Sequence, residues 1–320
     1  MNFLNFYIST FNKELKNKKY FILIFLYFFT LLHFFSFFLN RLDLKLNRND
    51  LIADYQTKKI NNDEFNNINT IFVGDSSLGN SIDKRFFNKI SNLKSENLSL
   101  TGSYGIAGSL GIIKKAYKKN PNIKNFIIMH TLNIWGRPFP KNAILELYSL
   151  KDINIYLSKN EIISYLFNLK EIYWHIKYIF NIKNVKNLKI NKNTDYLSQA
   201  DNKFSNNKKQ LKIGAKINNI KISKGKLKEI KMLEMFCKKN HINCIFLNGP
   251  IHETYAKKSN IFINYKNEII SKNFSHIKHF EKIFAYPGLK IGDSLDHIDQ
   301  KYKNESTRDI FEYIKEHLIY

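Results

Sequence analysis

Short apolar runs alternate with amphipathic stretches along most of this 320-residue chain. Four apolar runs end in turn residues and are predicted as buried strands, at 70–74, 97–102, 125–130 and 243–249. Helical spacing is found at 83–93, 108–119, 224–240 and 304–318. This alternation predicts an α/β fold in which helices cover both faces of a parallel sheet. In such folds ligands bind beyond the carboxyl ends of the strands.

The first long apolar segment, residues 20–39, has no formally charged side chain and is rich in Phe, Leu and Ile. A helix rises about 1.5 Å per residue, so this length spans a hydrocarbon core of roughly 30 Å. A cleaved signal peptide is the alternative, but its apolar stretch is usually about 7–15 residues long and ends at small residues. We therefore expect a cytoplasmic tail at 1–19, an uncleaved transmembrane anchor at 20–39 and a polar stalk at 40–68.

The charges beside this segment do not decide its orientation, because the lysines of 13–19 are nearly matched by Arg41, Lys45 and Arg48. A first span with a short basic tail usually leaves that tail in the cytoplasm, and a long following domain can be translocated whatever its charge. We therefore expect a single-pass protein of the cytoplasmic (inner) membrane. Residues from about 41 onward are expected on the periplasmic or extracellular side.

The formal net charge of +24 suggests an anionic partner. The lysines are scattered among Asn, Ile and Phe, and no nucleic-acid-binding motif accompanies them, so we expect no nucleic-acid partner. Such a surface is expected to attract anionic lipids or glycans instead. The two cysteines, Cys237 and Cys244, cannot build a disulfide framework or a Cys-rich zinc site. We expect them to be small buried apolar residues rather than a disulfide.

Residues 145–225 break the alternation of strands and helices. They contain an aromatic-rich helical stretch at 160–180, followed by Lys- and Asn-rich sequence with few apolar residues. An inserted helical cap with a mobile loop is the simpler interpretation. The alternative is an interfacial helix that lies on the bilayer or shapes an acceptor groove, for which Trp, Tyr, Phe and Lys are suitable residues.

The triplet Gly-Asp-Ser occurs twice, at 74–76 and 292–294. Ser76 directly follows a predicted strand and can begin a helix. Such a turn places the serine at the carboxyl edge of the sheet, beside backbone N–H groups that favour a developing oxyanion. Ser294 has no comparable strand before it, and we expect it to be a turn residue.

The second triplet lies in a loop that also carries Asp293, Asp296 and His297. A serine hydroxyl is a weak nucleophile unless a positioned imidazole takes its proton, and a carboxylate on the other imidazole nitrogen holds the ring in place. Ser76 and His297, with a nearby carboxylate, supply these parts from opposite ends of the domain.

In these blocks the chain resembles the SGNH hydrolases, also called GDSL-type esterases. FVGDSSLGN at 72–80 is similar to the first block of the family, with Ser76 as the nucleophile. Gly102 stands where the second block has its glycine, and Asn133 where the third has its asparagine, although the glycine and aspartate usual around that asparagine are missing. The resemblance assigns Gly102, Asn133 and the Ser76 amide to the oxyanion hole.

The fourth block of the family has an aspartate three residues before the catalytic histidine. In this chain Asp293 lies four residues before His297, and Asp296 is adjacent to it. We prefer Asp293 as the partner of His297, because adjacent side chains tend to diverge whereas positions four apart can meet. Asp296 remains the alternative.

The resemblance covers residues 70–135 and 240–315. It implies a three-layer α/β/α domain at 69–320 with a flavodoxin-like parallel sheet and a helical insertion at about 145–225. It also implies a membrane-anchored serine esterase or O-acyltransferase in which His297 deprotonates Ser76 and an acyl-enzyme forms. Hydrolysis and transfer use the same residues.

The implied substrate is an acylated glycan of the cell envelope or another ester. The lipid bilayer and a membrane protein that donates the acyl group are further expected partners. No cofactor is expected, and the nine histidines show no metal-ligand spacing. A catalytically inactive protein of the same fold, serving in surface-glycan assembly or binding, is the alternative, and the departures in the third and fourth blocks favour it.

Overall fold

The computed structural model describes residues 18–32, 34, 50–166 and 220–320. The chain divides into two compact units. One consists of Leu51–Ile153 with Asn187–Tyr320, and the other of Met1–Asp50 with Asn154–Lys186. The first of these units, called here the α/β domain, contains the sheet and the residues predicted to form the site.

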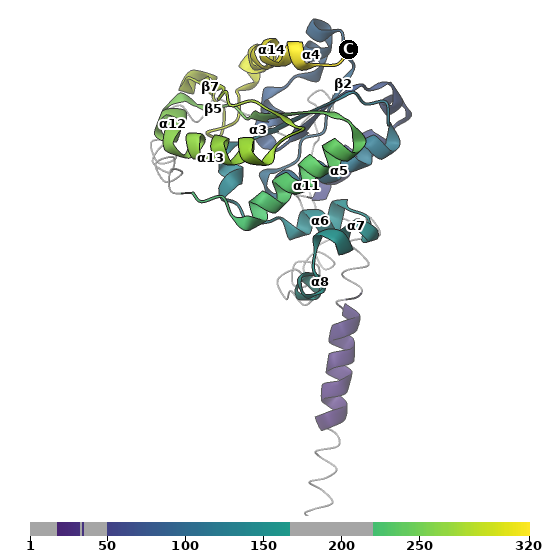
Figure 1. Cartoon of the computed structure of the whole chain (residues 1–320). Helices are drawn as coiled ribbons and strands as arrows, with labels where there is room; N and C mark the ends of the chain where they lie inside the picture. The colour runs from purple at the N-terminus through teal and green to yellow at the C-terminus, as the bar shows by residue number, and fades with distance from the viewer. Residues whose placement is uncertain (1–17, 33, 35–49, 167–219) are drawn as a thin grey trace, which may run out of the picture. The chain divides into compact units, whose positions relative to one another are not determined.

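A parallel sheet forms the centre of the α/β domain (Figure 1). It has five strands in the order β2-β1-β3-β4-β6. Its strands are β1 (Thr70–Gly74), β2 (Ser95–Asn97), β3 (Asn125–His130), β4 (Asn243–Asn248) and β6 (Lys278–His279). β1 and β3 are buried along their whole length, as expected for strands covered on both faces. The predicted α/β class with a parallel sheet is therefore confirmed.

Helices flank the sheet in two groups (Figure 1). α4 (Lys84–Ser91) and α14 (Lys303–Ile314) contact each other, whereas α5 (Gly105–Lys119) and α13 (Asn260–Asn273) belong to a second group joined by α11 (Lys224–Asn240). Right-handed crossovers explain this division. The connection from β1 to β2 runs toward one edge of the sheet, and the connections from β2 to β3 and from β3 to β4 run the other way.

The remaining elements are shorter. The short helices are α2 (Asp50–Asn61), α3 (Ser76–Ser81), α6 (Lys141–Leu147), α7 (Leu150–Tyr156), α8 (Lys159–Leu166) and α12 (Glu253–Lys258). β5 (Ile251–His252) and β7 (Ala285–Tyr286) pair in a separate two-stranded parallel sheet. The strand predicted at 97–102 is found earlier in the chain, since β2 covers Ser95–Asn97. The chain nevertheless continues beside β1, since the N–H of Leu100 donates to the carbonyl of Gly74 at 2.9 Å.

Aromatic contacts lock the α4–α14 face to the sheet. Phe72 of β1 meets Phe87 of α4 edge to face, with ring centroids 4.7 Å apart. Phe87 in turn meets Phe311 of α14 at 5.7 Å. Phe72 and Phe87 have no exposed surface, and burying rings of this size contributes about 2–3 kcal/mol each. The C-terminal helix is thereby held over the first strand of the sheet.

Residues 50–67 were expected to belong to a polar stalk, but they form α2 and the 3-10 helix η1 (Asp63–Asn67). Gln56 is fully buried, and its Nε2 donates to the carbonyl of Ser99 at 2.7 Å. The Lys59 ammonium lies 2.9 Å from the carboxylate of Glu96. The compact domain therefore begins before residue 69.

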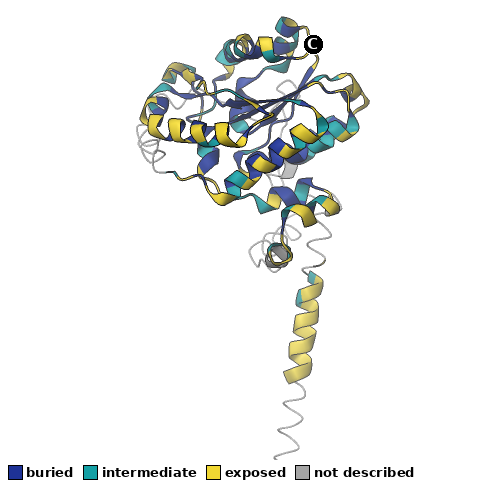
Figure 2. Cartoon of the chain, in the orientation of Figure 1, coloured by how far each residue is buried: buried dark blue, intermediate teal, exposed yellow. Residues whose placement is uncertain are grey.

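Residues 18–32 are helical and expose apolar side chains in all directions (Figure 2). Phe21, Ile22, Leu23 and Ile24 are 71%, 55%, 61% and 66% exposed, although successive residues of a helix point about 100° apart. Within the described residues, no helix is both long enough and apolar enough to cross a membrane. The anchor predicted at 20–39 includes residues 33 and 35–39, which lie outside the described residues.

The section predicted as a helical insertion, at about 145–225, begins with the end of α6 and with α7 and α8. Residues 167–219 lie outside the described residues, as do residues 1–17 and 40–49 of the predicted tail and stalk. The predictions for these segments remain predictions.

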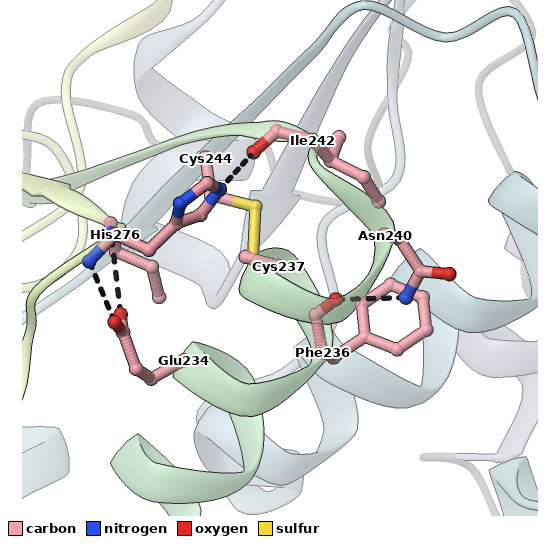
Figure 3. The surroundings of a disulfide bond; sticks show 8 residues. Glu234, Phe236, Cys237, Asn240, Ile242, Cys244 and His276 are labelled. Carbon is pink, nitrogen blue, oxygen red and sulfur yellow. Dashed lines mark hydrogen bonds between the residues drawn. A yellow bond between two sulfur atoms is a disulfide. The ribbon is translucent and has the colours of Figure 1, made fainter.

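Cys237 and Cys244 form a disulfide that joins the last turn of α11 to β4 (Figure 3). Our expectation of two unpaired apolar residues is therefore wrong. The cause is the end of α11, where His241 adopts a left-handed conformation with φ 53° and reverses the chain. The two Cα atoms then lie 6.3 Å apart, which is within the range that a disulfide can bridge.

Replacing both cysteines, as Cys237→Ala with Cys244→Ala, is expected to lower the free energy of unfolding by about 2 kcal/mol, because the unfolded chain regains the freedom of the closed loop. Urea unfolding of the purified protein measures this loss. Wild-type protein reduced before unfolding is the matched control and is expected to lose a similar amount. Two free thiols in the unreduced wild-type protein would contradict the disulfide.

Candidate functional site

The turn after β1 places Ser76 at the carboxyl edge of the sheet. Asp75 is the N-cap residue of α3, and its Oδ1 accepts hydrogen bonds from the N–H of Ser77 at 3.0 Å and from the Ser77 hydroxyl at 2.6 Å. Gly74 is required just before it, because a Cβ atom there would lie 1.8 Å from the carbonyl oxygen of Met129. β1 and β3 can therefore approach closely at Gly74, and α3 begins two residues later, at Ser76.

Ser76 is distinguished from its neighbours by exposure. Between residues 70 and 82, all of which the structure describes, every residue except Ser76 is buried. Ser77, the other serine beside it, is fully buried and hydrogen-bonded to Asp75. Ser76, which is half-buried, is therefore the most accessible residue of the turn, and it lies at the N-terminus of a helix, where backbone N–H groups favour negative charge.

A buried polar network supports this turn from below. Asp75 Oδ2 accepts from the N–H of Thr131 at 3.0 Å and lies 3.4 Å from Nδ1 of His130. That second contact lacks the alignment of a good hydrogen bond and is mainly electrostatic. The other ring nitrogen of His130, Nε2, is 3.0 Å from the hydroxyl of Ser109. All four side chains are almost fully buried, so this network holds the turn and is not open to a substrate.

Asp75 remains ionised although it has almost no exposed surface. Burial opposes its negative charge, but the contacts with His130, the hydroxyl of Ser77 and the N–H of Thr131 outweigh this effect and lower the pKa of the Asp75 carboxyl. A fixed negative charge therefore lies directly beneath Ser76.

The second Gly-Asp-Ser triplet lies in a closed loop. Ile291 and Ile298 form an antiparallel bridge, and the N–H of Gly292 donates to the carbonyl of His297 at 2.8 Å. The loop is fastened to β5, because the N–H of His252 donates to the carbonyl of Leu295 at 2.8 Å. The loop thus holds its polar side chains against the segment that follows β4.

Within this loop, Asp293 and His297 are joined directly, since Oδ1 of Asp293 lies 2.7 Å from Nδ1 of His297. Oδ1 of Asp296 lies farther away, 3.8 Å from Nε2 of the same ring, and accepts a hydrogen bond from the hydroxyl of Ser294. With Nδ1 donating to Asp293, a neutral His297 has Nε2 free to accept a proton. Ser294 is a half-buried turn residue that pairs with Asp296.

The pKa of His297 is raised. Burial opposes the charged imidazolium, but the hydrogen bond with Asp293 and the negative charges of Asp296, Asp293 and Asp75 outweigh that effect. The pKa of Asp293 is lowered by its hydrogen bond to His297.

Further hydrogen bonds bring the C-terminal segment to α3. The Lys303 ammonium donates to the carbonyl of Gly79 at 3.0 Å, and the hydroxyl of Thr307 accepts from the N–H of Asp83 at 2.9 Å. The segments that carry Ser76 and His297 therefore meet at one edge of the sheet. In the part of the chain that the structure describes, no hydrogen bond joins these two side chains to each other.

Gly102 and Asn133 lie at the same edge. Gly102 follows the segment in which Leu100 pairs with Gly74, and Asn133 follows the end of β3. Oδ1 of Asn133 accepts a hydrogen bond from the hydroxyl of buried Tyr255 at 2.5 Å. With Oδ1 so engaged, the Nδ2 amide of Asn133 is left as a donor.

Two residues that sequence reasoning missed contact these positions. The guanidinium of Arg137 lies against Gly102, with Nη1 2.5 Å from the place that a Cβ atom on the glycine would take. Tyr255 orients Asn133, and burial, followed by the charge of Asp296, raises its pKa. The only sequence signal for Tyr255 was its place shortly after the strand predicted at 243–249.

Outside this edge of the sheet, the described residues include a cavity but no cluster of metal ligands. Within them, no group of three or more His, Cys, Asp and Glu side chains is placed to hold a metal ion. A cavity of about 440 Å³ is lined by residues 282–286 and by Asp309, Glu312 and Tyr313 of α14. It shares no residue with the arrangement around Ser76.

Neither a scan against models of known protein families nor a search of curated proteins finds a match to this chain.

The Asp293→Asn variant is expected to lower the pKa of His297, because it removes a negative charge and changes the acceptor on Nδ1 while burial remains. Asp296→Asn is the matched control and should lower the pKa less, since its oxygen is 3.8 Å from the ring. NMR titration of the imidazole measures both values. A larger fall in Asp296→Asn would make Asp296 the main partner.

Proposed function

We propose that this chain is a membrane-anchored serine esterase or O-acyltransferase of the SGNH (GDSL-type) class. The observation that carries the proposal is the contrast between a half-buried Ser76 and the fully buried residues around it, with an Asp293-bound His297 in a loop held at the same edge of the sheet. An accessible serine at a strand-to-helix turn and an imidazole held by a carboxylate are the parts that nucleophilic acyl transfer requires.

The arrangement of the sheet supports this class. The order β2-β1-β3-β4-β6 matches the flavodoxin-like order, with helices in two groups that flank the sheet as a three-layer α/β/α domain requires. In folds of this kind ligands bind beyond the carboxyl ends of the strands, where Ser76, Gly102 and Asn133 lie. The fold alone does not establish an activity, so the proposal depends on the side chains at that edge.

The proposed reaction begins when Nε2 of His297 takes the proton of the Ser76 hydroxyl and the oxygen attacks an ester carbonyl. The amides of Ser76 and Gly102, with Nδ2 of Asn133, hold the oxyanion of the tetrahedral intermediate. Collapse of that intermediate breaks the ester bond, and His297 returns the proton to the leaving alcohol. A water molecule or a sugar hydroxyl then attacks the acyl-enzyme by the same route.

Two observations support a location at the outer side of a membrane. The helix at 18–32 exposes apolar side chains all around, which is unfavourable in water. The disulfide between Cys237 and Cys244 is of a kind that persists in oxidising compartments. We therefore propose an anchored protein that acts on acylated envelope glycans or similar esters, with the bilayer and a membrane acyl-donor protein as partners and without nucleic acid.

The second candidate is a catalytically inactive protein of the same fold that binds or assembles surface glycans. It is favoured by the lack of a Ser76–His297 hydrogen bond among the described residues. Against it, catalytic hydrogen bonds are often long before substrate binds and tighten afterwards. The Asp293–His297 hydrogen bond is also already formed, and a protein that only binds glycans has no need of an imidazole oriented in this way.

Wild-type protein is expected to react with a fluorophosphonate probe, and Ser76→Ala to abolish the labelling because it removes the nucleophile. His297→Ala should slow labelling by about 10²–10⁴-fold, which is the usual contribution of a general base. Gel fluorescence and peptide mapping follow the probe. Ser294→Ala removes the serine of the other triplet and serves as the matched control, with labelling unchanged. Wild-type protein that stays unlabelled would favour the inactive candidate.

Ester hydrolysis is expected to fall as the pH drops, because the reaction needs neutral His297. The raised pKa of His297 means that the ring stays protonated to a higher pH than usual. The rate should therefore reach half its maximum at a pH above about 6.5, the value for an ordinary histidine. Asp293→Asn should move that midpoint to lower pH as well as reduce the maximum rate. A pH–rate profile that is flat between about pH 5 and 8 would exclude His297 as the base.

A further inference from the structure

Arg137 is a cation at the edge of the proposed site that the reaction scheme does not use. It is exposed, and it follows the 3-10 helix η3 (Leu132–Gly136), which also carries Asn133. In the part of the chain that the structure describes, no carboxylate pairs with its guanidinium and no hydrogen bond from its side chain is formed. Within those described residues, its five N–H donors are therefore unused.

The guanidinium of Arg137 lies against the main chain at Gly102. Nη1 and Cζ of Arg137 lie 2.5 and 2.9 Å from the place that a Cβ atom of Gly102 would occupy, so the group fills the space that a side chain at that position would take. A residue other than glycine at 102 would displace it. Gly102 thus serves the guanidinium as well as any role in the oxyanion hole.

The backbone of Arg137 is also constrained. Pro138 follows it, which disfavours helical conformations, and Arg137 has φ −81° and ψ 146°. Its N–H donates to the carbonyl of Ile134 at 3.1 Å. On the other side of the turn, Gly136 packs against Ile220, since a Cβ atom there would lie 2.9 Å from Ile220 Cδ1. The arginine therefore extends from a fixed turn rather than from a loose loop.

The start of α5, which follows Gly102 in the chain, is fixed as well. Glu229 of α11 is fully buried, and its carboxylate accepts from the N–H of Ala107 at 2.9 Å and from the Lys226 ammonium at 2.6 Å. This contact holds the start of α5, which begins three residues after Gly102. Glu229 forms its ion pair with Lys226, so its negative charge is already balanced and does not bind Arg137.

We infer that Arg137 and Gly102 form an anion-binding subsite and that the substrate carries a carboxylate or phosphate group near its reacting ester. A planar guanidinium binds both kinds of oxyanion with paired hydrogen bonds. The net charge of +24 adds a long-range attraction for such substrates. The statement about the ester rests on the proposed function, whereas anion binding by Arg137 does not.

The test measures binding to the full-length protein by calorimetry at constant ionic strength. The probes are two pairs that differ in charge, sn-glycerol 1-phosphate with glycerol and D-glucuronate with D-glucose. Wild-type protein should bind at least one anionic probe more tightly than its neutral counterpart, and the preferred pair identifies phosphate or carboxylate as the group. Arg137→Gln should weaken that binding by about tenfold or more, in keeping with the loss of a charged hydrogen bond.

Arg85→Gln is the matched control, because it removes the same charge from an exposed position on α4. It should leave anion binding unchanged. Equal losses in both variants, unchanged binding in Arg137→Gln, or no preference for the anionic probes in wild-type protein would each overturn the subsite.

Fluorophosphonate labelling of the same samples separates this inference from the proposed function. Loss of anion binding in Arg137→Gln, in a wild-type protein whose Ser76 never reacts, would support the subsite and contradict the esterase. Reaction at Ser76 without any anion preference would support the esterase and overturn the subsite. If both hold, 4-nitrophenyl glutarate should be cleaved with a higher kcat/KM than 4-nitrophenyl pentanoate, and Arg137→Gln should remove that advantage.

Discussion

The buried carboxylate of Asp75 is the interaction on which the arrangement around Ser76 depends. A charge without solvent is costly unless its oxygens are satisfied, and here they accept from the backbone and hydroxyl of Ser77 and from the backbone of Thr131, with His130 alongside. These partners belong to α3 and to the end of β3. By satisfying Asp75 they stabilise the turn after β1, in which Ser76 is the one residue that is not fully buried.

The rest of the domain brings the C-terminal segment to that turn. Parallel strands place all their carboxyl ends at one edge, so chain that follows β1, β3 and β4 gathers there irrespective of sequence distance. Packing of α14 on α4 and the contact of Lys303 with Gly79 then bring the loop of His297 to the same edge. The negative charge of Asp75 adds to those of Asp296 and Asp293 in raising the pKa of His297.

The sequence predicted the elements better than the contacts between them. Strong apolar periodicity located β1, β3, β4 and α11. Buried strands and amphipathic helices can be recognised in this way because each has a characteristic spacing of apolar residues within a short stretch of sequence. The two-residue strand β6 leaves no such pattern. The Cys237–Cys244 disulfide was missed because it depends on the left-handed backbone conformation of His241. That conformation follows from the reversal of the chain after α11, and the histidine side chain gives no sign of it in the sequence.

At the site, too, features within one short stretch of sequence were predicted and contacts between distant segments were not. The loop containing Asp293 and His297 could be recognised because its residues are close in sequence, whereas the Tyr255–Asn133 and Arg137–Gly102 contacts join residues of different segments. His130 is buried, and its role beneath Asp75 follows only from the pairing of β1 with β3. Long-range polar contacts of this kind have no signature in a single sequence.

The central claim is that Ser76 and His297 act on each other, and the ionisation of a thiol placed at position 76 tests this most directly. In the Ser76→Cys variant, a nearby imidazolium should stabilise the thiolate and lower the thiol pKa below about 8.5, as read from the pH dependence of alkylation by iodoacetamide. Adding His297→Ala should return that pKa toward the ordinary value. The same alkylation profile with and without His297 would show that the two side chains do not meet, and would contradict the account.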